Sequence, residues 1–232
     1  MASSVLIQDS KVVTSENKVL PRLFGIFSIV FALITAFVDV GTVIACLISW
    51  YNGVEGDVDF LAHVIPLVLP CFSFVLFTGS LGFSLSAMLV TIFSSFARIK
   101  SSGRKGCLIS IATIMCVTAF SSLVIRGFNV FTSLVMVDGS TTMDYVPILI
   151  GSLLLTIILT LVCSAILCVL GAIATILCGR GWCAYTLSAI GLMLFPLISL
   201  LVFLALGLIL MCLIAMALSL VILLLALVIK GL

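Results

Sequence analysis

Two charged residues lie within otherwise apolar stretches of the sequence, and they could act on each other. Asp39 belongs to the stretch 23–50, and Arg126 belongs to SLVIRGFNVF, residues 122–131. A carboxylate in apolar surroundings must be protonated, pair with a cation or face water. A guanidinium suits it well because it can donate two parallel hydrogen bonds to one carboxylate. The sequence therefore predicts an intramembrane charge pair between Asp39 and Arg126.

Another interpretation places Arg126 at the edge of its apolar stretch. The 19 residues from 107 to 125 are uninterrupted by charge, so the long arginine side chain could reach back to a polar interface. Asp39 would then be protonated or hydrated. A third possibility is that the polar groups line a water-filled conduit. At 1.5 Å per residue, Asp39 lies about 24 Å past Leu23 and Arg126 about 28 Å past Cys107. This small difference in depth leaves the pair within reach.

The elements that must position these residues are predicted from composition. The chain is 64% hydrophobic and 8% charged, whereas soluble domains are about one quarter charged. Apolar runs longer than about 18 residues indicate membrane-spanning helices. The sequence therefore predicts an all-α integral membrane protein, a polytopic, multi-pass helical bundle. Its apolar runs cover residues 23–50, 61–96, 107–137, 145–178 and 183–229.

The last run is too long for one crossing of a bilayer, which takes about 20 residues. We expect two helices joined by a minimal turn at Gly207 or Pro196, which gives six transmembrane helices; the alternative is four spans plus a hydrophobic C-terminal hairpin. The predicted organisation is a cytosolic polar N-terminal segment (1–22), a four-span helical bundle with short loops (23–182) and a hydrophobic pair of helices or hairpin (183–232).

The distribution of basic residues predicts the orientation. With six crossings, nine of the ten lysines and arginines lie on one side, while the opposite loops contain only acids. The positive-inside rule makes the basic side cytosolic, so both the N- and C-termini should be cytosolic. The first 22 residues lack the apolar core of a signal peptide, so we expect the first run to remain as an uncleaved anchor. Which membrane holds the protein is not indicated.

Residue types that support catalysis are scarce. His63 is the only histidine, which excludes sites that need several histidines. It follows an acidic segment, where Asp57 or Asp59 could stabilise the protonated imidazole in a pH-sensitive contact. No phosphate-binding loop, dinucleotide fingerprint or nucleophile elbow occurs. We predict no enzyme, no catalytic residues, no cofactor and no metal site.

None of the nine cysteines falls in a predicted outer loop, so no extracellular disulfide framework is expected. Cys107, Cys178 and Cys183 lie at the predicted cytosolic boundary, where cysteines either pack as small apolar residues or carry S-palmitoyl groups. Small residues also recur every fourth position, which favours close packing of helices in lipid. These predicted packing faces are Gly41 with Ala45, Gly82 with Ser86, and Ser164 with Cys168 and Ala172.

One part of the chain resembles a known family. FVLFTGSLGFSLSA, residues 74–87, is followed by a basic loop and by KGCLISIATIMC, residues 105–116. This order resembles the CD20-like four-span family, in which a GSL-type second span precedes a Lys-Cys-Leu entry to the third. Here Gly106 separates the lysine from the cysteine, and the block after Cys183 has no counterpart in that family. The resemblance implies a four-span member as the weakest alternative.

The sequence favours a non-enzymatic protein that acts through helix packing, as a scaffold or accessory subunit of a membrane complex. Its expected partners are the lipid bilayer and other membrane proteins or a second copy of itself. No basic patch interleaved with aromatic residues occurs, so no nucleic-acid partner is expected. The alternative from another class is a small channel or transporter whose polar path includes Asp39.

Overall fold

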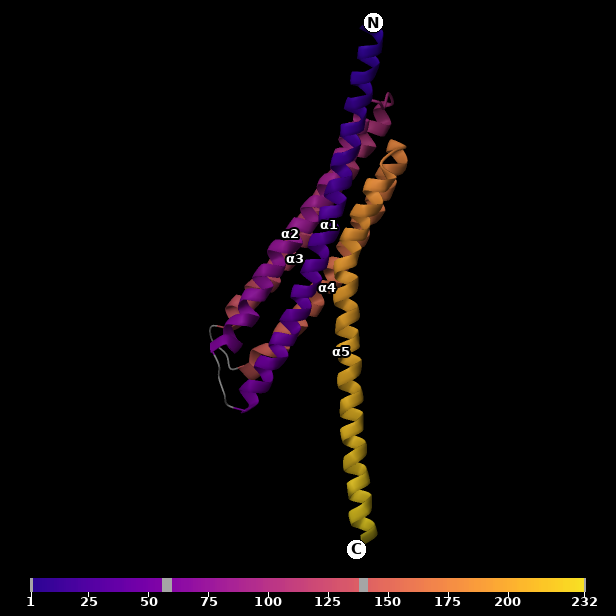
Figure 1. The fold of residues 1–232 in the computed structure, drawn as a ribbon. Helices are drawn as coiled ribbons and strands as arrows, with labels where there is room; N and C mark the ends of the chain where they lie inside the picture. The colour runs from indigo at the N-terminus through magenta and orange to yellow at the C-terminus, as the bar shows by residue number, and fades with distance from the viewer. Residues whose placement is uncertain (1, 56–59, 138–141, 232) are drawn as a thin grey trace.

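The computed structural model describes residues 2–55, 60–137 and 142–231, and it describes side chains within 19–48, 51, 68–135, 148–209 and most of 211–218. Every described stretch of any length is helical, as predicted, and no strand occurs in them. The helices are long and joined by short connections (Figure 1). They are α1 (Ala2–Glu55), α2 (Phe60–Phe96), α3 (Ser102–Val137), α4 (Thr142–Cys178) and α5 (Trp182–Gly231).

Each helix contains a segment long and apolar enough to cross a membrane, and these five segments are 29 to 35 residues long. The helices extend past the apolar runs of the sequence. α1 includes most of the polar segment 1–22, and α3 begins at Ser102, so it takes in Arg104 and Lys105 of the basic stretch. A helix satisfies its own backbone hydrogen bonds, which is why it is the favoured form for apolar segments of this length.

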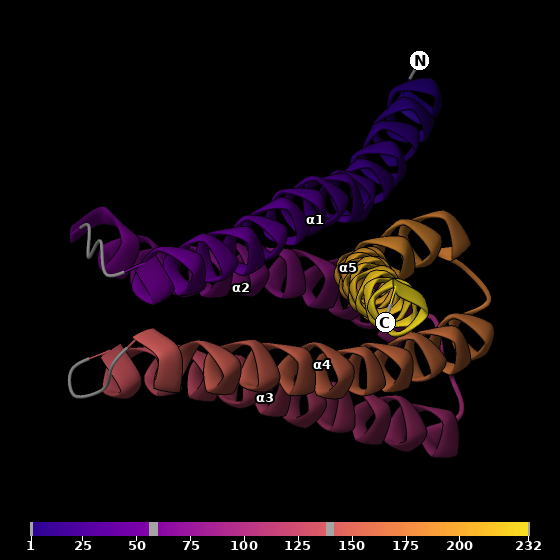
Figure 2. The same ribbon diagram turned by 90° about the horizontal axis from the view of Figure 1, so that it is seen from below.

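Four of the helices pack as two neighbouring pairs, with the fifth between them. α1 packs mainly on α2 and α5, and α3 packs mainly on α4. Seen along the bundle, α1 and α2 form one side and α3 and α4 the other, while α5 lies against both (Figure 2). Within the described ranges α1 and α3 do not pack directly on each other. Any contact between them must therefore be made by long side chains across the core.

Polar side chains are enriched inside the bundle and large apolar ones outside it. Asp39, Arg126 and Asn129 are all buried, together with many serines and threonines. Phe37 is 75% exposed and Phe120 is 68% exposed. Between the polar groups, a continuous apolar core joins residues such as Phe77, Met115, Leu167 and Phe195. The exposed surface is thus the more apolar one, which is the reverse of a soluble bundle.

The structure does not confirm the prediction of two C-terminal helices, nor the alternative of a hairpin. α5 continues without interruption from Trp182 to Gly231 and includes both Pro196 and Gly207. A glycine inside a helix costs only about 1 kcal/mol, whereas a turn in apolar surroundings leaves several backbone groups without hydrogen bonds. Proline removes one hydrogen bond and need not end the helix. The structure therefore has five candidate spans where six were predicted.

The odd number of helices also changes the placement of the chain ends. The start of α1 and the end of α5 lie at opposite ends of the molecule (Figure 1). The prediction that both termini are cytosolic depended on a second crossing after Gly207, and the side of the membrane on which each terminus lies stays a prediction. Lys230 is consequently separated from the other basic segments.

Two of the three predicted small-residue packing faces are not interfaces. A side chain added at Gly41 or Gly82 would meet no atom within 4 Å. The close approach occurs between α1 and α5 instead, where a Cβ on Gly25 would lie 2.6 Å from the Cβ of Leu187. The face of Ser164 and Cys168 does pack, because Tyr185 of α5 donates a hydrogen bond to the Cys168 carbonyl at 3.0 Å. The four-residue spacing of small residues alone did not distinguish the face that packs from the two that do not.

Candidate functional site

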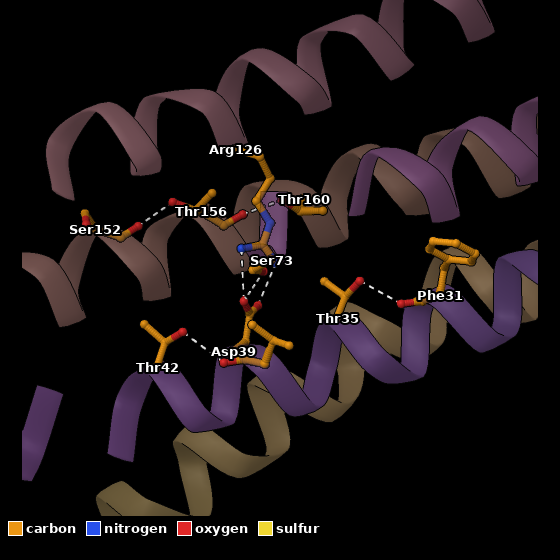
Figure 3. A network of polar contacts seen from close by, with 10 residues as sticks. Phe31, Thr35, Asp39, Thr42, Ser73, Arg126, Ser152, Thr156 and Thr160 are labelled. Atoms are coloured by element: carbon orange, nitrogen blue, oxygen red, sulfur yellow. Dashed lines mark hydrogen bonds and ion pairs between the residues drawn. The ribbon is translucent and has the colours of Figure 1, made fainter. Parts of the chain in front are cut away.

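The structure brings Asp39 of α1 and Arg126 of α3 together in the centre of the bundle (Figure 3). Nη2 of Arg126 lies 2.6 Å from Oδ2 of Asp39, and Nη1 donates to Oδ1 at 3.4 Å. The two side chains are 2% and 1% exposed. This is the fork-shaped, two-point geometry that favours arginine over lysine as the partner of a carboxylate. The pair connects two helices that do not otherwise pack on each other.

A third helix supplies a further donor to the same carboxylate. The hydroxyl of Ser73 in α2 donates a hydrogen bond to Oδ1 of Asp39. On α1, the hydroxyls of Thr35 and Thr42 bond to the carbonyls of Phe31 and Val38, at 2.7 and 2.9 Å, and not to Asp39. The carboxylate therefore receives its hydrogen bonds from α2 and α3, while its neighbours on α1 are satisfied locally. Figure 3 shows the carboxylate directed away from its own helix toward these donors.

Two aromatic rings flank the guanidinium. Cζ of Arg126 lies 4.5 Å from the centre of the Phe195 ring and 5.3 Å from the centre of the Phe77 ring. The two rings are themselves 5.5 Å apart. A desolvated cation over an aromatic face gains about 2 kcal/mol or more. Because Phe195 belongs to α5 and Phe77 to α2, four helices meet at this cation.

The local sequence explains why these groups face inward. On α1 the buried polar residues Ser28, Thr35, Asp39 and Thr42 are separated by seven, four and three positions, so they form one stripe of a helix. On α3 the buried polar residues are Ser122, Arg126, Asn129 and Ser133, separated by four, three and four positions. A polar stripe on an otherwise apolar helix turns toward polar partners, because exposure to apolar surroundings would leave its hydrogen-bonding groups unpaired.

The interfacial alternative for Arg126 does not describe this structure. α3 continues for eleven residues beyond Arg126, to Val137. Asn129 is buried at 2%, and its side-chain oxygen accepts a hydrogen bond from Ser152 of α4 at 3.0 Å. Phe128 and Phe131, which flank it, are exposed. Arg126 and Asn129 thus belong to one inward face, and the phenylalanines belong to the outer one.

Sequence reasoning missed Ser73, Phe77 and Phe195. Serines are abundant in the chain, so Ser73 carried no signal beyond its place in the second apolar run. Phe77 lies one helical turn after Ser73, and that spacing of four could have placed both on one face. Phe195 precedes Pro196 in a run of almost uniform apolarity. Nothing in its sequence neighbourhood distinguishes it from the other aromatic residues.

The remaining predicted site residues lie elsewhere. His63 is in α2, but its side chain is outside the described set, and Asp57 and Asp59 fall outside the described residues altogether. The predicted pH-sensitive contact of His63 stays a prediction. Cys107 and Cys183 are exposed and Cys178 is partly buried, all near the end of the bundle that contains the 97–101 loop. These positions are compatible with acylation, which stays a prediction as well.

The geometry limits the chemistry that the site can perform. Asp39 is bonded to Arg126 and Ser73 and is 1% exposed, so its carboxylate is not open to solvent. Across the part of the chain whose side chains are described, no three histidine, cysteine, aspartate or glutamate side chains gather as metal ligands would. The arrangement is suited to holding helices together. Comparisons with protein families, with curated proteins and with solved structures give no match to this chain.

Proposed function

We propose that the chain is a non-enzymatic, multi-pass integral membrane protein. Support comes from the five long apolar segments and from the inverted distribution of polarity. Phe72, Val117 and Leu155 are all more than half exposed, which suits contact with lipid chains rather than water. The buried Asp39–Arg126 pair, by contrast, is shielded by protein on every side.

We further propose that the basic end of the bundle is cytosolic. This end contains the lysines and arginines of the N-terminal segment, the 97–105 stretch and the α4–α5 turn. In membrane proteins, lysine and arginine are enriched on the cytosolic side. Trp182, at the start of α5, is exposed at the same end, as interfacial tryptophans are. Five crossings would then put the end of α5 on the opposite side.

The proposed role is that of a scaffold or accessory subunit, and the observation that carries it is the length of α5. Its 50 residues correspond to about 75 Å of helix, against about 30 Å of hydrocarbon core. Contacts with the rest of the chain extend to Phe203 and Leu206. Beyond them Leu208, Met211 and Met216 are exposed, on a segment that leaves the bundle (Figure 1). Exposed apolar side chains such as these three offer a natural surface for another apolar protein.

Native cysteines provide a direct test of this role. Cys212 is exposed on the projecting part of α5, and Cys116 is exposed on the outer face of α3. Two full-length variants would each keep one of these cysteines and replace the other eight with alanine. Treatment of native membranes with a membrane-permeable bismaleimide should cross-link the Cys212 variant into one discrete species. The matched Cys116 variant should remain largely monomeric. Equal cross-linking of both variants, or of neither, would contradict a role carried by α5.

A channel or transporter is the second candidate, and the hydroxyl groups around the ion pair favour it. Thr35, Ser73, Thr156 and Thr160 are buried on three helices near Asp39 and Arg126 (Figure 3). Polar groups of this kind line conduction paths in membrane proteins. Flux of small ions into proteoliposomes that contain wild-type protein or Asp39→Asn distinguishes the two roles. Flux that the substitution abolishes supports transport, whereas no flux from either protein leaves the scaffold.

A further inference from the structure

A basic cavity lies at the end of the bundle far from the ion pair. It has a volume of about 540 Å³ and opens between the loop after α2, the first turn of α3 and the α4–α5 turn. Its size is within the range of about 300–1,000 Å³ that is typical of small-molecule sites. Four cationic side chains contribute to its lining, namely Arg98, Lys100, Arg104 and Arg180.

Backbone geometry brings these four residues together from separate parts of the chain. The amide of Arg98 donates to the Ser95 carbonyl at 3.0 Å, which turns the chain at the end of α2. At the other side of the cavity, Gly179 ends α4 with its amide bonded to the Thr175 carbonyl at 2.9 Å, and its φ is +66°. Gly181, with φ +93°, lies so close to Thr91 of α2 that a side chain there would collide. Arg180, between these two glycines, is thereby held beside the end of α2.

The charge of this cavity is not balanced by the described part of the protein. Asp39 is the one acidic residue whose side chain is described, and it is paired with Arg126 in the centre of the bundle. The four cationic side chains are exposed, so salt screens their mutual repulsion, but together they produce a positive field that attracts an anion. The first turn of α3 adds to this field, because free amides and the helix dipole favour negative charge at a helix start.

We propose that this cavity binds phosphate monoester groups, and specifically the phosphorylated inositol headgroup of a membrane lipid. Arginine forks and a lysine bind phosphate oxygens through charge-assisted hydrogen bonds. Basic pockets between spans on the cytosolic side take headgroups of this class. Cys178 lines the cavity and Trp182 is exposed beside it, and the adjoining α4 and α5 segments are apolar enough to span a membrane. The inference goes beyond the scaffold role and rests on the proposed membrane location and the proposed cytosolic placement of the basic end.

The test uses the full chain in phosphatidylcholine nanodiscs. The probes are dioctanoyl phosphatidylinositol bisphosphate, dioctanoyl phosphatidylserine and free inositol trisphosphate, with binding followed by calorimetry. The test variant is Arg98→Gln with Arg180→Gln. The matched control, Arg22→Gln with Lys105→Gln, removes the same charge from the same end of the molecule but touches no residue of the lining. A conservative variant, Arg98→Lys with Arg180→Lys, keeps the charge and loses the planar forks.

We expect the bisphosphate lipid to bind more tightly than phosphatidylserine. The double glutamine variant should lose about 30-fold in affinity, five- to sixfold for each cation near the surface. The control should lose less than half as much on a logarithmic scale, and the lysine variant should retain intermediate affinity. Thermal melting in nanodiscs confirms that every variant is folded.

The two phosphate sources give different results. Tight binding of the lipid with weak binding of inositol trisphosphate assigns the site to a membrane lipid, whereas equal binding of both assigns it to a soluble inositol phosphate. Either result supports a phosphate site if the double glutamine variant loses the binding. Equal losses in the glutamine variant and the control would overturn the proposal, and so would equal affinity for phosphatidylserine and the bisphosphate.

Discussion

The buried pair of Asp39 and Arg126 allows the sharpest test of the structure. Asp39→Ala leaves the guanidinium without its carboxylate in a site that is 2% exposed. Removing one partner of a buried ion pair costs about 3–5 kcal/mol, because an uncompensated charge remains. Arg126→Ala leaves the carboxylate with the Ser73 hydroxyl alone, and it also removes the cation from the rings of Phe77 and Phe195. We expect the free energy of unfolding to fall by about 4 kcal/mol in Asp39→Ala and by about 5 kcal/mol in Arg126→Ala.

The double variant has no buried charge left, so its cost should be well below the sum of the single costs. With about 9 kcal/mol for simple additivity and about 6 kcal/mol expected for the double variant, the coupling is about 3 kcal/mol. Unfolding in mixed micelles with increasing dodecyl sulfate, followed by tryptophan fluorescence, measures the three free energies. Thr35→Ala is the matched control, because this buried hydroxyl bonds only to the Phe31 carbonyl of its own helix.

The free energy of unfolding of the control Thr35→Ala should fall by no more than about 1 kcal/mol, which is the usual net contribution of one hydrogen bond. Additive costs in the double variant would refute the pairing. A cost below about 1 kcal/mol for Asp39→Ala would refute it too, because it would mean that Arg126 reaches water without the carboxylate.

Three further predictions concern other contacts. Phe195→Leu should cost about 2 kcal/mol in the same unfolding assay, because it removes the ring nearest the guanidinium; a neutral result would contradict the ring contact. Gly191→Ala should destabilise by about 1–3 kcal/mol, because its Cβ would collide with Ser28, while Gly207→Ala, in open space, should gain up to about 1 kcal/mol. Acyl exchange after hydroxylamine should detect lipid on the exposed Cys107 and Cys183 and little on the buried Cys46. Replacing Cys107 and Cys183 with serine should abolish this labelling. If the labelling is unchanged in that variant, acylation at these two positions is excluded.

Much of the fold could be predicted because apolar runs have few structural options. The segments around Asp39 and Arg126 are long and nearly free of charge, so they must form helices, and their depths agree within one turn. The pair itself followed from the small number of ways in which a buried carboxylate can be stabilised. These arguments depend on residue type and position along one helix, which a sequence displays directly.

The features that could not be predicted depend on how the helices are arranged in space. Gly41 and Gly25 look alike in the sequence, yet only Gly25 lies at a close helix contact. Phe195 and Leu204 lie in the same uniform run, but one covers the guanidinium and the other is exposed. Whether Gly207 would break α5 was likewise undecidable from local preference, because a single glycine changes helix stability by only about 1 kcal/mol. The basic cavity needed the α4–α5 turn to be placed beside α2, and no pattern in the sequence indicated that.

Because Asp39 and Arg126 are far apart along the chain, they are synthesised several seconds apart. The two residues are 87 positions apart, and at about 5–20 residues per second Arg126 is made about 4–17 seconds after Asp39. During that interval α1 holds a carboxylate whose cation does not yet exist. Ser73, 34 positions after Asp39, is its first native hydrogen-bond donor, made after about 2–7 seconds. The carboxylate of α1 thus acquires its native partners in two steps, the Ser73 hydroxyl of α2 first and the Arg126 guanidinium of α3 second.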